Sequence, residues 1–358
     1  MKTLDEARIQ IDKIDRDMAR LFEERMQVVE EVVAYKLANN LQVLDSSREQ
    51  QVIDKNKAYI QHAEFEPFYI DFITHLMSLS RKHQHQISSK EIIGYQGVEG
   101  AFSHIALNRL FKDQVAKSFN SFEEVVLAVL NDDIEKGVLP FENSYTGEIG
   151  EVLDLLYKYD VKISDIYDLK IDQNLLALKG TELKDIKQVY SHEQALNQSK
   201  HFLSMYPFDL IPYPNTALAA KFVSETQDKS KAAVASIETA ELYGLNVLVK
   251  NINTSVDNTT RFIVISKNAK DEGNRMSILF TTDHNSGSLA KVINAIAKHG
   301  FNMENIKSRA IHNQPWKYYF YVEVEGSHQD AEAFALFADF ERYCQEFKYL
   351  GTYTKKDY

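Results

Sequence analysis

Apolar residues recur at intervals of three and four along the first part of the chain, from Leu4 through Ile11, Ile14 and Met18 to Val28. This spacing is typical of the buried stripe of a packed helix. No glycine occurs before Gly94, so we expect residues 1 to about 86 to be helical, with helices over about 4–39, 46–62 and 66–84. At about 1.5 Å per residue the first helix would exceed about 50 Å, more than one small three-helix domain can cover, which predicts an interlocked dimer.

Short β-branched runs alternate with amphipathic segments from Glu91 onward. This alternation predicts an α/β fold with parallel sheets. The segment His83–Lys90 is interpreted as a linker. The expected strands are Ile92–Tyr95, Gly137–Pro140, Val161–Ile166, Val189–Ser191, Ala232–Ala235 and Arg261–Ile265, and the expected helices include Phe122–Leu130 and Thr216–Ser224.

A polar segment, Lys267–Asn274, is interpreted as a second linker. The pattern after it predicts strand, helix, two strands, helix and strand, which is the ferredoxin-like order. We therefore expect three domains, over residues 1–88, 91–268 and 275–358.

The acidic composition, with a net charge of −11, argues against nucleic acid or an anionic membrane as partner. Local cationic clusters then stand out as candidate anion sites. The single cysteine excludes an intramolecular disulfide, and His83 and His85 favour a solvated helix end over a metal site. We predict no metal and no cofactor. Neither a signal peptide nor a membrane-spanning run is evident, which predicts a cytoplasmic protein.

Arg25 occupies a position in the apolar stripe of the first helix, where a charge is costly unless a carboxylate or an anionic ligand faces it. Lys36 lies on the same face, and Arg8 lies about 100° away, from where it could reach a partner chain. Further polar residues cluster on the next two helices; a solvated, salt-bridged surface is the alternative. They are Asp45, Arg48 and Glu49, and then Ser80 and Gln84.

These residues, in this order, resemble the all-helical class of chorismate mutases, which rearrange chorismate to prephenate by a Claisen reaction. The resemblance implies that Arg25, and Arg8 of a partner chain, hold the two substrate carboxylates. It implies that Lys36 and Gln84 donate to the ether oxygen and that Glu49 accepts from the ring hydroxyl. Asp45, Arg48 and Ser80 would complete the substrate contacts.

Polar strings follow several of the predicted strands. They are Gly97-Val-Glu-Gly-Ala-Phe-Ser-His104, Pro140-Phe-Glu-Asn-Ser144 with Thr146-Gly147, Tyr190-Ser-His-Glu-Gln194, Asn215-Thr-Ala217 and Asn258-Thr-Thr-Arg-Phe262. Each alone could be ordinary helix capping, and His104 and His192 are interpreted as structural helix-start residues. Together, at strand ends, they predict a ligand crevice.

The same strings resemble prephenate dehydratase, a fold of two α/β lobes like periplasmic binding proteins. The family expels water and carbon dioxide from prephenate to give phenylpyruvate. The resemblance implies that Thr260 donates to the departing hydroxyl and that Arg261 anchors a carboxylate. Candidate cleft donors are Asn143, Ser144, Thr146, Ser191 and Gln194.

The last region resembles an ACT domain, a small-molecule sensor. Gly287, Ser288 and Leu289 open its first predicted helix, where exposed N–H groups suit an amino-acid carboxylate. Ser308 and Arg309 stand in the second effector element, where the phenylalanine-sensitive pattern Glu-Ser-Arg-Pro is replaced by Lys307-Ser-Arg-Ala310. The resemblance implies phenylalanine as effector; a drifted dimerisation module is the alternative.

Taken together, the three resemblances imply a bifunctional chorismate mutase/prephenate dehydratase of phenylalanine biosynthesis, acting on small dicarboxylates. Two alternatives remain at this point. One is a chain in which only one catalytic domain is active and the other serves oligomerisation. The other is a non-enzymatic carboxylate-binding sensor.

Overall fold

The structure is a computed structural model that describes residues 3–38, 46–88, 91–255, 257–312 and 314–354, without the side chains of residues 37, 38, 46–50, 85, 86 and 88. It consists of two compact units. Residues 1–91 with 131–133 form the first, and the remainder forms the second. Within the described ranges, every helix is too short or too polar to cross a bilayer.

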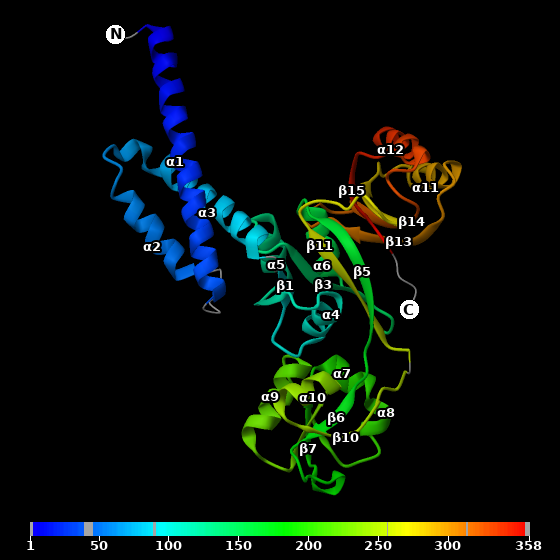
Figure 1. Ribbon diagram of the computed structural model, residues 1–358. Helices are drawn as coiled ribbons and strands as arrows, with labels where there is room; N and C mark the ends of the chain where they lie inside the picture. Colours follow the sequence, from blue (N-terminus) through cyan, green and yellow to red (C-terminus); the bar gives the residue numbers. More distant parts are fainter. Residues whose placement is uncertain (1–2, 39–45, 89–90, 256, 313, 355–358) are drawn as a thin grey trace. The chain divides into compact units, whose positions relative to one another are not determined.

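The first unit contains α1 (Leu4–Ala38), α2 (Ser46–Lys57) and α3 (Glu66–Ser88), with a 3₁₀ turn over Ala63–Phe65 (Figure 1). The helices α1 and α2 both pack on α3, and Val33, Ile73 and Met77 form the buried contacts. The second helix ends earlier than expected, because the N–H groups of Tyr59 and Ile60 close turns onto Asn56 and Lys57.

The third helix continues through most of the segment predicted to be a linker, so that prediction is wrong for residues 83–88. His83 explains part of the difference. Its Nε2 lies 2.8 Å from Glu30 Oε1, which ties this turn of α3 to α1. Arg25 contacts Ser80, and Glu30 contacts His83, so residue numbers rise together along the two helices. The helices α1 and α3 therefore run in the same direction.

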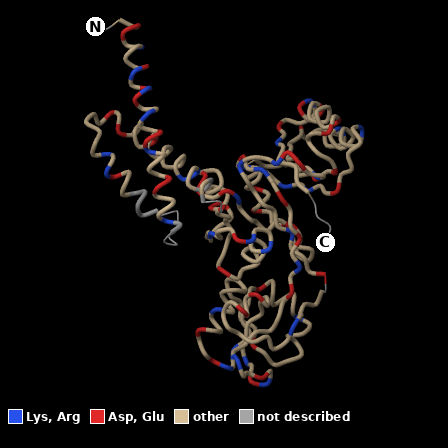
Figure 2. The backbone as a smooth tube through the Cα atoms, viewed as in Figure 1, with Lys and Arg blue, Asp and Glu red and all other residues tan. Residues whose placement is uncertain are grey.

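Much of the apolar stripe of α1 is not covered within one chain. Leu4, Ile14, Leu21 and Val28 are 67%, 49%, 53% and 53% exposed. Charged residues of both signs alternate on the rest of the helix, as Figure 2 shows, and Arg20 pairs with Glu24 at 3.2 Å. An amphipathic helix is normally covered along its apolar stripe, so this face of α1 is unpartnered in the single chain.

The second unit begins with two α/β lobes. The first lobe has the strand order β2-β1-β3-β11-β5, with β4 beside β3, and the second has the order β10-β6-β9-β7-β8. In the first, the strands are β1 (Ile92–Gln96), β2 (Val115–Phe119), β3 (Lys136–Asn143), β4 (Gly147–Glu148), β5 (Lys162–Lys170) and β11 (Thr259–Ser266). In the second, they are β6 (Asn174–Ala177), β7 (Gln188–Ser191), β8 (Asp209–Pro212), β9 (Lys231–Ala235) and β10 (Asn246–Val249).

Both sheets are mixed, which corrects the expectation of parallel sheets. The strand β11 runs antiparallel to both β3 and β5, and β6 runs antiparallel to both β9 and β10. The reason is topological. In the first lobe, the chain returns from the second lobe and places β11 between β3 and β5, which both precede it in the sequence.

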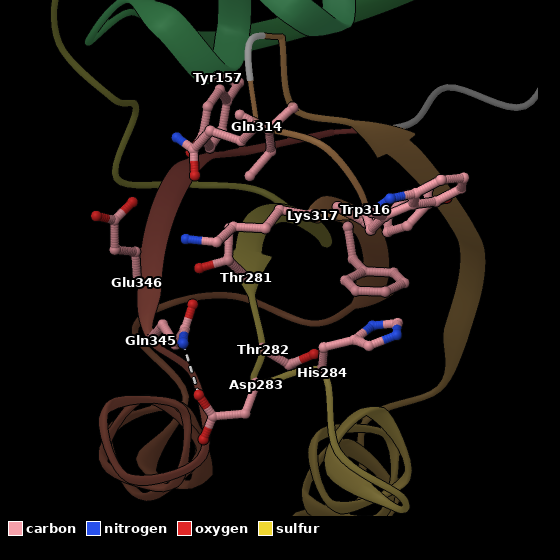
Figure 3. Close-up of a pocket in the computed structure, with 13 residues that line it drawn as sticks. Tyr157, Thr281, Thr282, Asp283, His284, Gln314, Trp316, Lys317, Gln345 and Glu346 are labelled. Carbon is pink, nitrogen blue, oxygen red and sulfur yellow. Dashed lines mark hydrogen bonds between the residues drawn. The ribbon is translucent and has the colours of Figure 1, made fainter.

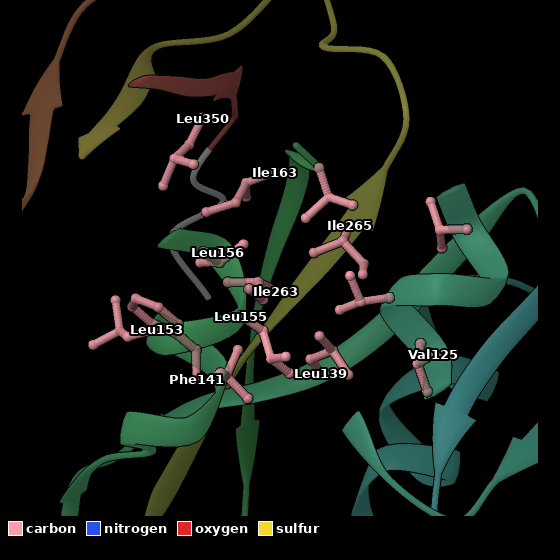
Figure 4. Close-up of a cluster of buried hydrophobic side chains, with 14 of the residues drawn as sticks. Val125, Leu139, Phe141, Leu153, Leu155, Leu156, Ile163, Ile263, Ile265 and Leu350 are labelled. Atoms are coloured by element: carbon pink, nitrogen blue, oxygen red, sulfur yellow. The ribbon is translucent and has the colours of Figure 1, made fainter. Parts of the chain in front are cut away.

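The helices pack on opposite faces of the first sheet. On one face, α4 (Phe102–Leu110) covers Val138, Phe262 and Val264. On the other, α5 (Phe122–Leu130) and α6 (Gly150–Lys158) cover Leu139, Ile263 and Ile265 (Figure 4). Alternate residues of β11 therefore face different surroundings, as strand geometry requires. The helices of the second lobe are α7 (Glu193–Gln198), α8 (Lys200–Leu203), α9 (Thr216–Thr226) and α10 (Ile237–Tyr243).

Two crossing segments, 171–173 and the described residues of 250–258, join the lobes and hydrogen-bond to each other. Asn253 accepts from Gln173 N at 2.6 Å and donates to Ile171 O at 2.8 Å. Asn258 O accepts from Ile171 N at 2.8 Å. These hydrogen bonds tie the two crossing segments together at the base of the cleft between the lobes.

The C-terminal region forms a four-stranded antiparallel sheet in the order β13-β14-β12-β15, with two helices, which confirms the ferredoxin-like prediction. Its elements are β12 (Arg275–Thr281), α11 (Ser288–Lys298), β13 (Met303–Ala310), β14 (Tyr318–Glu325), α12 (Ala331–Tyr343) and β15 (Glu346–Tyr353). The two helices cover one face.

The other face of this sheet docks against the first lobe. Leu279, Tyr319, Tyr321, Leu350 and Tyr353 join the same buried cluster as α5 and α6. The polar segment before it is also fixed, since Lys270 bridges Thr352 and pairs with Asp165 at 2.6 Å. The C-terminal domain is thus packed onto the two-lobed domain rather than tethered by a free linker.

Gly351 allows a close approach of β15 to β5. Its φ is +140°, and a Cβ atom there would overlap the carbonyl oxygen of Ile163 in β5. We expect Gly351→Ala to destabilise the second unit by about 1–3 kcal/mol, because overpacking must push β15 from β5. Urea and thermal unfolding measure the change. Gly244→Ala is the control, since Gly244 has φ +66° and open space around it. Equal losses in the two variants would contradict the packing argument.

Candidate functional site

A cavity of about 380 Å³ lies between the two lobes of the second unit. Its walls come from strand ends and helix starts of both lobes. The first lobe supplies Gly97, Ser103, Asn143, Thr146, Thr260 and Phe262, and the second lobe supplies His192, Gln194, Asn215 and Thr216, with Gln173 from a crossing segment. The cavity is of a size that suits a small metabolite.

Asn143 and Thr260 form the centre of this cavity, at the ends of β3 and β11. Both are nearly buried, and the register places them directly opposite each other. Asn143 Nδ2 donates to Thr260 Oγ1 and to Asn258 Oδ1, each at 2.9 Å. Because the asparagine supplies the donor, the threonine proton remains for another acceptor, and no described residue accepts it.

The other end of the Asn143 amide fixes the turn that follows β3. Its Oδ1 accepts from the backbone N–H groups of Tyr145 and Thr146 at 3.0 and 3.1 Å. Gln194, at the start of α7 in the second lobe, donates to Thr146 Oγ1 at 3.0 Å. A chain of polar contacts therefore crosses the cleft from Gln194 through Thr146 and Asn143 to Thr260.

Three of the predicted cleft residues do not line the cavity. Ser191 is fully buried and donates to Val234 O at 2.6 Å, and Ser144 exchanges hydrogen bonds with the Asp257–Thr259 backbone. Arg261 forms a bidentate pair with Asp168 at 2.9 and 3.1 Å, and this pairing raises the pKa of its guanidinium. Since neighbouring residues of a strand point to opposite faces, Arg261 faces away from Thr260. This geometry does not support its expected role as carboxylate anchor.

Among the described residues that line the cavity there is no lysine or arginine. The electropositive groups at the cavity are instead helix N-termini. Ala101–Ser103 begin α4 and Asn215–Thr216 begin α9, one helix from each lobe. The first N–H groups of a helix lack intrahelical partners and attract anions.

The sequence analysis missed Gln173. This side chain is 2% exposed, its Nε2 donates to Gln198 at 3.4 Å, and its Oε1 has no partner in the described structure. A buried acceptor without a partner is costly unless a ligand supplies the donor. No local motif marks Gln173, because its place depends on the two crossing segments.

The two histidines flanking this site are structural. His104 Nδ1 accepts from Gly100 N at 3.1 Å, its ring packs 4.9 Å from that of Tyr95, and burial lowers the pKa of its imidazole. His192 caps α7. No cluster of three potential metal ligands occurs among the described residues.

In the helical unit, Arg25 lies between α1 and α3. It is half-buried, burial lowers the pKa of its guanidinium, and its Nη1 donates to Ser80 Oγ. Among the described side chains, which exclude residues 37–50, no carboxylate pairs with Arg25. Gln84 lies one turn beyond Ser80, and its buried Oε1 has no described partner.

The remaining predicted residues of this unit are placed less centrally or lie outside the description. Lys36 is half-buried in the last turn of α1. The exposed Arg8 meets Asp5 at 3.7 Å, far along α1 from Arg25. Asp45 and the side chains of Arg48 and Glu49 are outside the described residues.

In the C-terminal domain, Gly287 adopts φ +82° immediately before α11, with Ser288 and Leu289 in the first turn. Ser308 and Arg309 lie on β13 and line a different surface pocket, of which the Gly287 turn is no part. Arg309 pairs with Asp154 at 2.7 Å and with Glu148 at 3.2 Å, both in the first lobe. Within one chain, the two predicted effector elements are therefore not brought together.

A second cavity, of about 220 Å³, opens at the end of the C-terminal sheet, beside Tyr157 of α6 (Figure 3). Asp283, Lys317 and Glu346 give it mixed charge, and Trp316 stands at its rim. Gln345 donates to Asp283 at 2.6 Å across it. None of the residues predicted for a site lines this cavity.

Comparison with known proteins identifies three domains in succession. Family models match residues 7–85 (chorismate mutase type II), 93–270 (prephenate dehydratase) and 276–341 (ACT domain). Among solved structures, a prephenate dehydratase from Staphylococcus aureus is similar, with 28% identity, a TM-score of 0.65, and coverage of 73% of this chain and 99% of that one. A quorum-quenching acylase, GqqA, is similar as well, with 26% identity, a TM-score of 0.69, and coverage of 74% and 98%.

Full-length relatives share the whole arrangement. A bifunctional chorismate mutase/prephenate dehydratase from Buchnera aphidicola is 31% identical over 89% of this chain and 88% of its own length. One from Aquifex aeolicus is 30% identical over 99% of both chains. With the three domains in this order, the chain belongs to the family of bifunctional chorismate mutase/prephenate dehydratases, enzymes that catalyse two steps of phenylalanine biosynthesis.

Proposed function

We propose that Thr260 is the proton donor of the dehydratase step, and that Asn143 orients it. The supporting observation is the 2.9 Å bond from Asn143 Nδ2 to Thr260 Oγ1, which leaves the threonine proton for the substrate. As the carbon–carbon bond to the ring carboxylate breaks, its electron pair enters the ring and carbon dioxide leaves. The hydroxyl leaves with the carbon–oxygen electrons and takes up a proton, which solvent finally replaces. A positioned donor stabilises charge that develops on the departing oxygen.

The two carboxylates of prephenate would bind at the N-termini of α4 and α9, which face the cavity from opposite lobes. Neutral N–H groups suit this reaction, because one carboxylate must leave as neutral carbon dioxide. A direct arginine pair would stabilise the carboxylate in the ground state as well as in the transition state. Gln173 Oε1 and Gln194 are positioned to bind the remaining polar groups of the substrate.

For the mutase step, we propose that Arg25 binds one carboxylate of chorismate between α1 and α3. Its half-burial without a described carboxylate partner supports this role, because a guanidinium in a helical bundle needs a counter-charge. Gln84 and Lys36 would hold the ether oxygen, with Ser80 fixing Arg25. Glu49, Asp45 and Arg48 would complete the site from α2 and the residues before it.

We also propose a homodimer in which the unpartnered stripe of α1 packs against a second copy. The exposed Ile14, Leu21 and Val28 support this arrangement. A second α1 lying along the first would also bring Arg8 of the partner toward the Arg25 site, which α1 of the same chain cannot do.

Two substitutions should separate the two activities. We expect Arg25→Ala to lower chorismate turnover at least about 1000-fold with prephenate turnover unchanged, and Thr260→Ala to do the reverse, since each removes a group that acts in only one site. Both reactions can be followed on the same purified chain, by chorismate loss and phenylpyruvate formation. A parallel fall of both activities in either variant, with unfolding unaffected, would contradict two separate sites.

The dimer proposal predicts that Leu21→Asp weakens the dimer, because it buries a charge in the apolar stripe of α1. The mass measured by light scattering should fall. If other contacts hold the oligomer together, the mutase activity should instead fall by at least about tenfold. Dehydratase activity should persist. The control is Met205→Asp, which places the same charge on another exposed apolar residue, in the second lobe. A monomeric parent protein would refute the proposal.

Regulation by phenylalanine through the ACT domain is the remaining proposal, with its carboxylate at the Gly287–Leu289 turn. Titrating phenylalanine should lower dehydratase activity in the parent chain. Gly287→Val should weaken this inhibition, because a β-branched residue resists φ +82°. Gly300→Val is the control, since Gly300 has φ +78° and equally open surroundings. If both variants respond like the parent, the turn is not the effector site.

A further inference from the structure

The two faces of β3 and β11 carry different kinds of residues where the strands end. Asn143 and Thr260 face the cleft. Their neighbours Glu142 and Arg261 lie opposite each other in the strand register, with their side chains on the other face of the sheet. That face is the one on which the ACT sheet docks. Each residue of the proposed dehydratase centre is therefore one peptide unit away from a charged residue at the ACT interface.

The pairing of β3 with β11 is irregular at this point. Arg261 lies opposite Glu142 but Phe262 lies opposite Pro140, so Phe141 is an extra residue in β3. Bulges of this kind redirect the side chains that follow them. Here the bulge brings Phe141 and Glu142 toward the ACT sheet and sends Asn143 to the cleft.

Lys307 of β13 contacts both residues of the bulge. Its ammonium nitrogen lies 2.7 Å from Glu142 Oε1 and 5.7 Å from the centre of the Phe141 ring, and its side chain is 9% exposed. Tyr321 of β14 packs against the same ring at 5.2 Å. A lysine this deeply buried, with its charge paired to one carboxylate, is far more strongly constrained than a surface ion pair.

The short strand β4, which pairs with β3, also carries a carboxylate that a cation of the ACT domain neutralises. Glu148 of β4 lies directly opposite Glu142, and two like charges in that arrangement repel. Arg309 meets Glu148 at 3.2 Å, just as Lys307 meets Glu142. The Arg309 guanidinium lies against Gly150, so a Cβ at that position would displace it.

We infer that Lys307 is a positioning residue for prephenate dehydration: through Glu142 and Phe141 it holds the β3 bulge so that Asn143 reaches Thr260. The inference rests on the proposed roles of Asn143 and Thr260. It gives the Lys307 of this chain a part in the reaction even when no effector is bound. Misplacing a reacting group by about 1 Å can cost about 100-fold in rate, so a loosened bulge lowers turnover without removing any group that touches substrate.

The test compares Lys307→Met with Lys298→Met in the full chain, measuring kcat and KM for prephenate. Lys298 is the control for loss of a lysine ion pair in the ACT domain, because its pair with Asp339 lies wholly within that domain. We expect Lys307→Met to lower kcat about 10- to 100-fold while KM changes less than about threefold, the pattern of a lost transition-state alignment. Lys298→Met and the mutase activity of both variants should match the parent. Parental kcat in Lys307→Met overturns the inference.

A charge-reversed pair separates positioning from a general effect on folding. Lys307→Glu and Glu142→Lys should each lower kcat, and the double variant should recover to within about threefold of the parent, because the pair is restored in the opposite sense. A double variant no better than the singles overturns the inference. If Lys307→Met does not fold, the near-isosteric Glu142→Gln decides alone, and its parental kcat would overturn the proposal too.

The Thr260→Ala result separates this inference from the site proposal beneath it. If Thr260→Ala keeps full dehydratase activity, the assignment of the site is wrong. If Thr260→Ala is inactive and Lys307→Met turns over at the parental rate, the site stands and the positioning role alone is lost.

Discussion

The antiparallel pairing of β11 with β3 is the constraint on which the dehydratase half of the chain depends. It brings Asn143 and Thr260, separated by 117 residues, to a 2.9 Å hydrogen bond. Since β11 follows the whole second lobe in the sequence, that pairing requires the chain to return to the first lobe through the second crossing segment. The cleft, its buried asparagine and the orientation of the threonine therefore depend on one long-range strand pairing rather than on any local motif.

The same pairing explains how an acidic protein can bind a dicarboxylate in a cleft that has no cationic side chain among its lining residues. Helix N-termini from both lobes face the cavity, and their partial positive charges are fixed by the backbone. Lys307, Arg309 and Arg261 lie on the reverse face, where they neutralise Glu142, Glu148 and Asp168 respectively. Charge is thus separated by the thickness of one sheet, with neutral donors on the reacting side and ion pairs on the docking side. The helical unit differs, because it places a cationic side chain at its proposed site. Its half-buried Arg25 has no acid beside it among the described side chains.

Local patterns predicted what local physics decides. The three-four spacing of α1, the core strands such as Gly137–Pro140, and the final β-α-β-β-α-β order were all evident because each depends on a short window of residues. The family resemblances located Thr260, Asn143 and Gln194, which the structure brings together. Arg261 and Ser191 were expected to line the cleft but do not. The face on which the Arg261 side chain lies, and the backbone carbonyl to which Ser191 donates, follow from the strand register, which the sequence does not reveal. Gln173 carried no signal at all, because it becomes a cleft residue only through the paired crossings. The mixed sheets and the docked ACT sheet likewise depend on long-range contacts.

Docking changes what an ACT domain can do for the enzyme that carries it. A tethered sensor affects the reaction only when its ligand is bound, but a sheet packed against the reverse face of the catalytic strands acts continuously. Lys307 and Arg309 occupy the element in which the phenylalanine-sensitive pattern has its effector residues, and both are engaged here by carboxylates of the first lobe. An effector that drew β13 away would have to break these partly buried ion pairs, and one of them, Lys307–Glu142, lies one residue from Asn143. With Lys307 in the positioning role that we infer, the ion pairs that hold the bulge are among those that such an effector would have to break, so weakening them should change both the basal rate and the ease of inhibition.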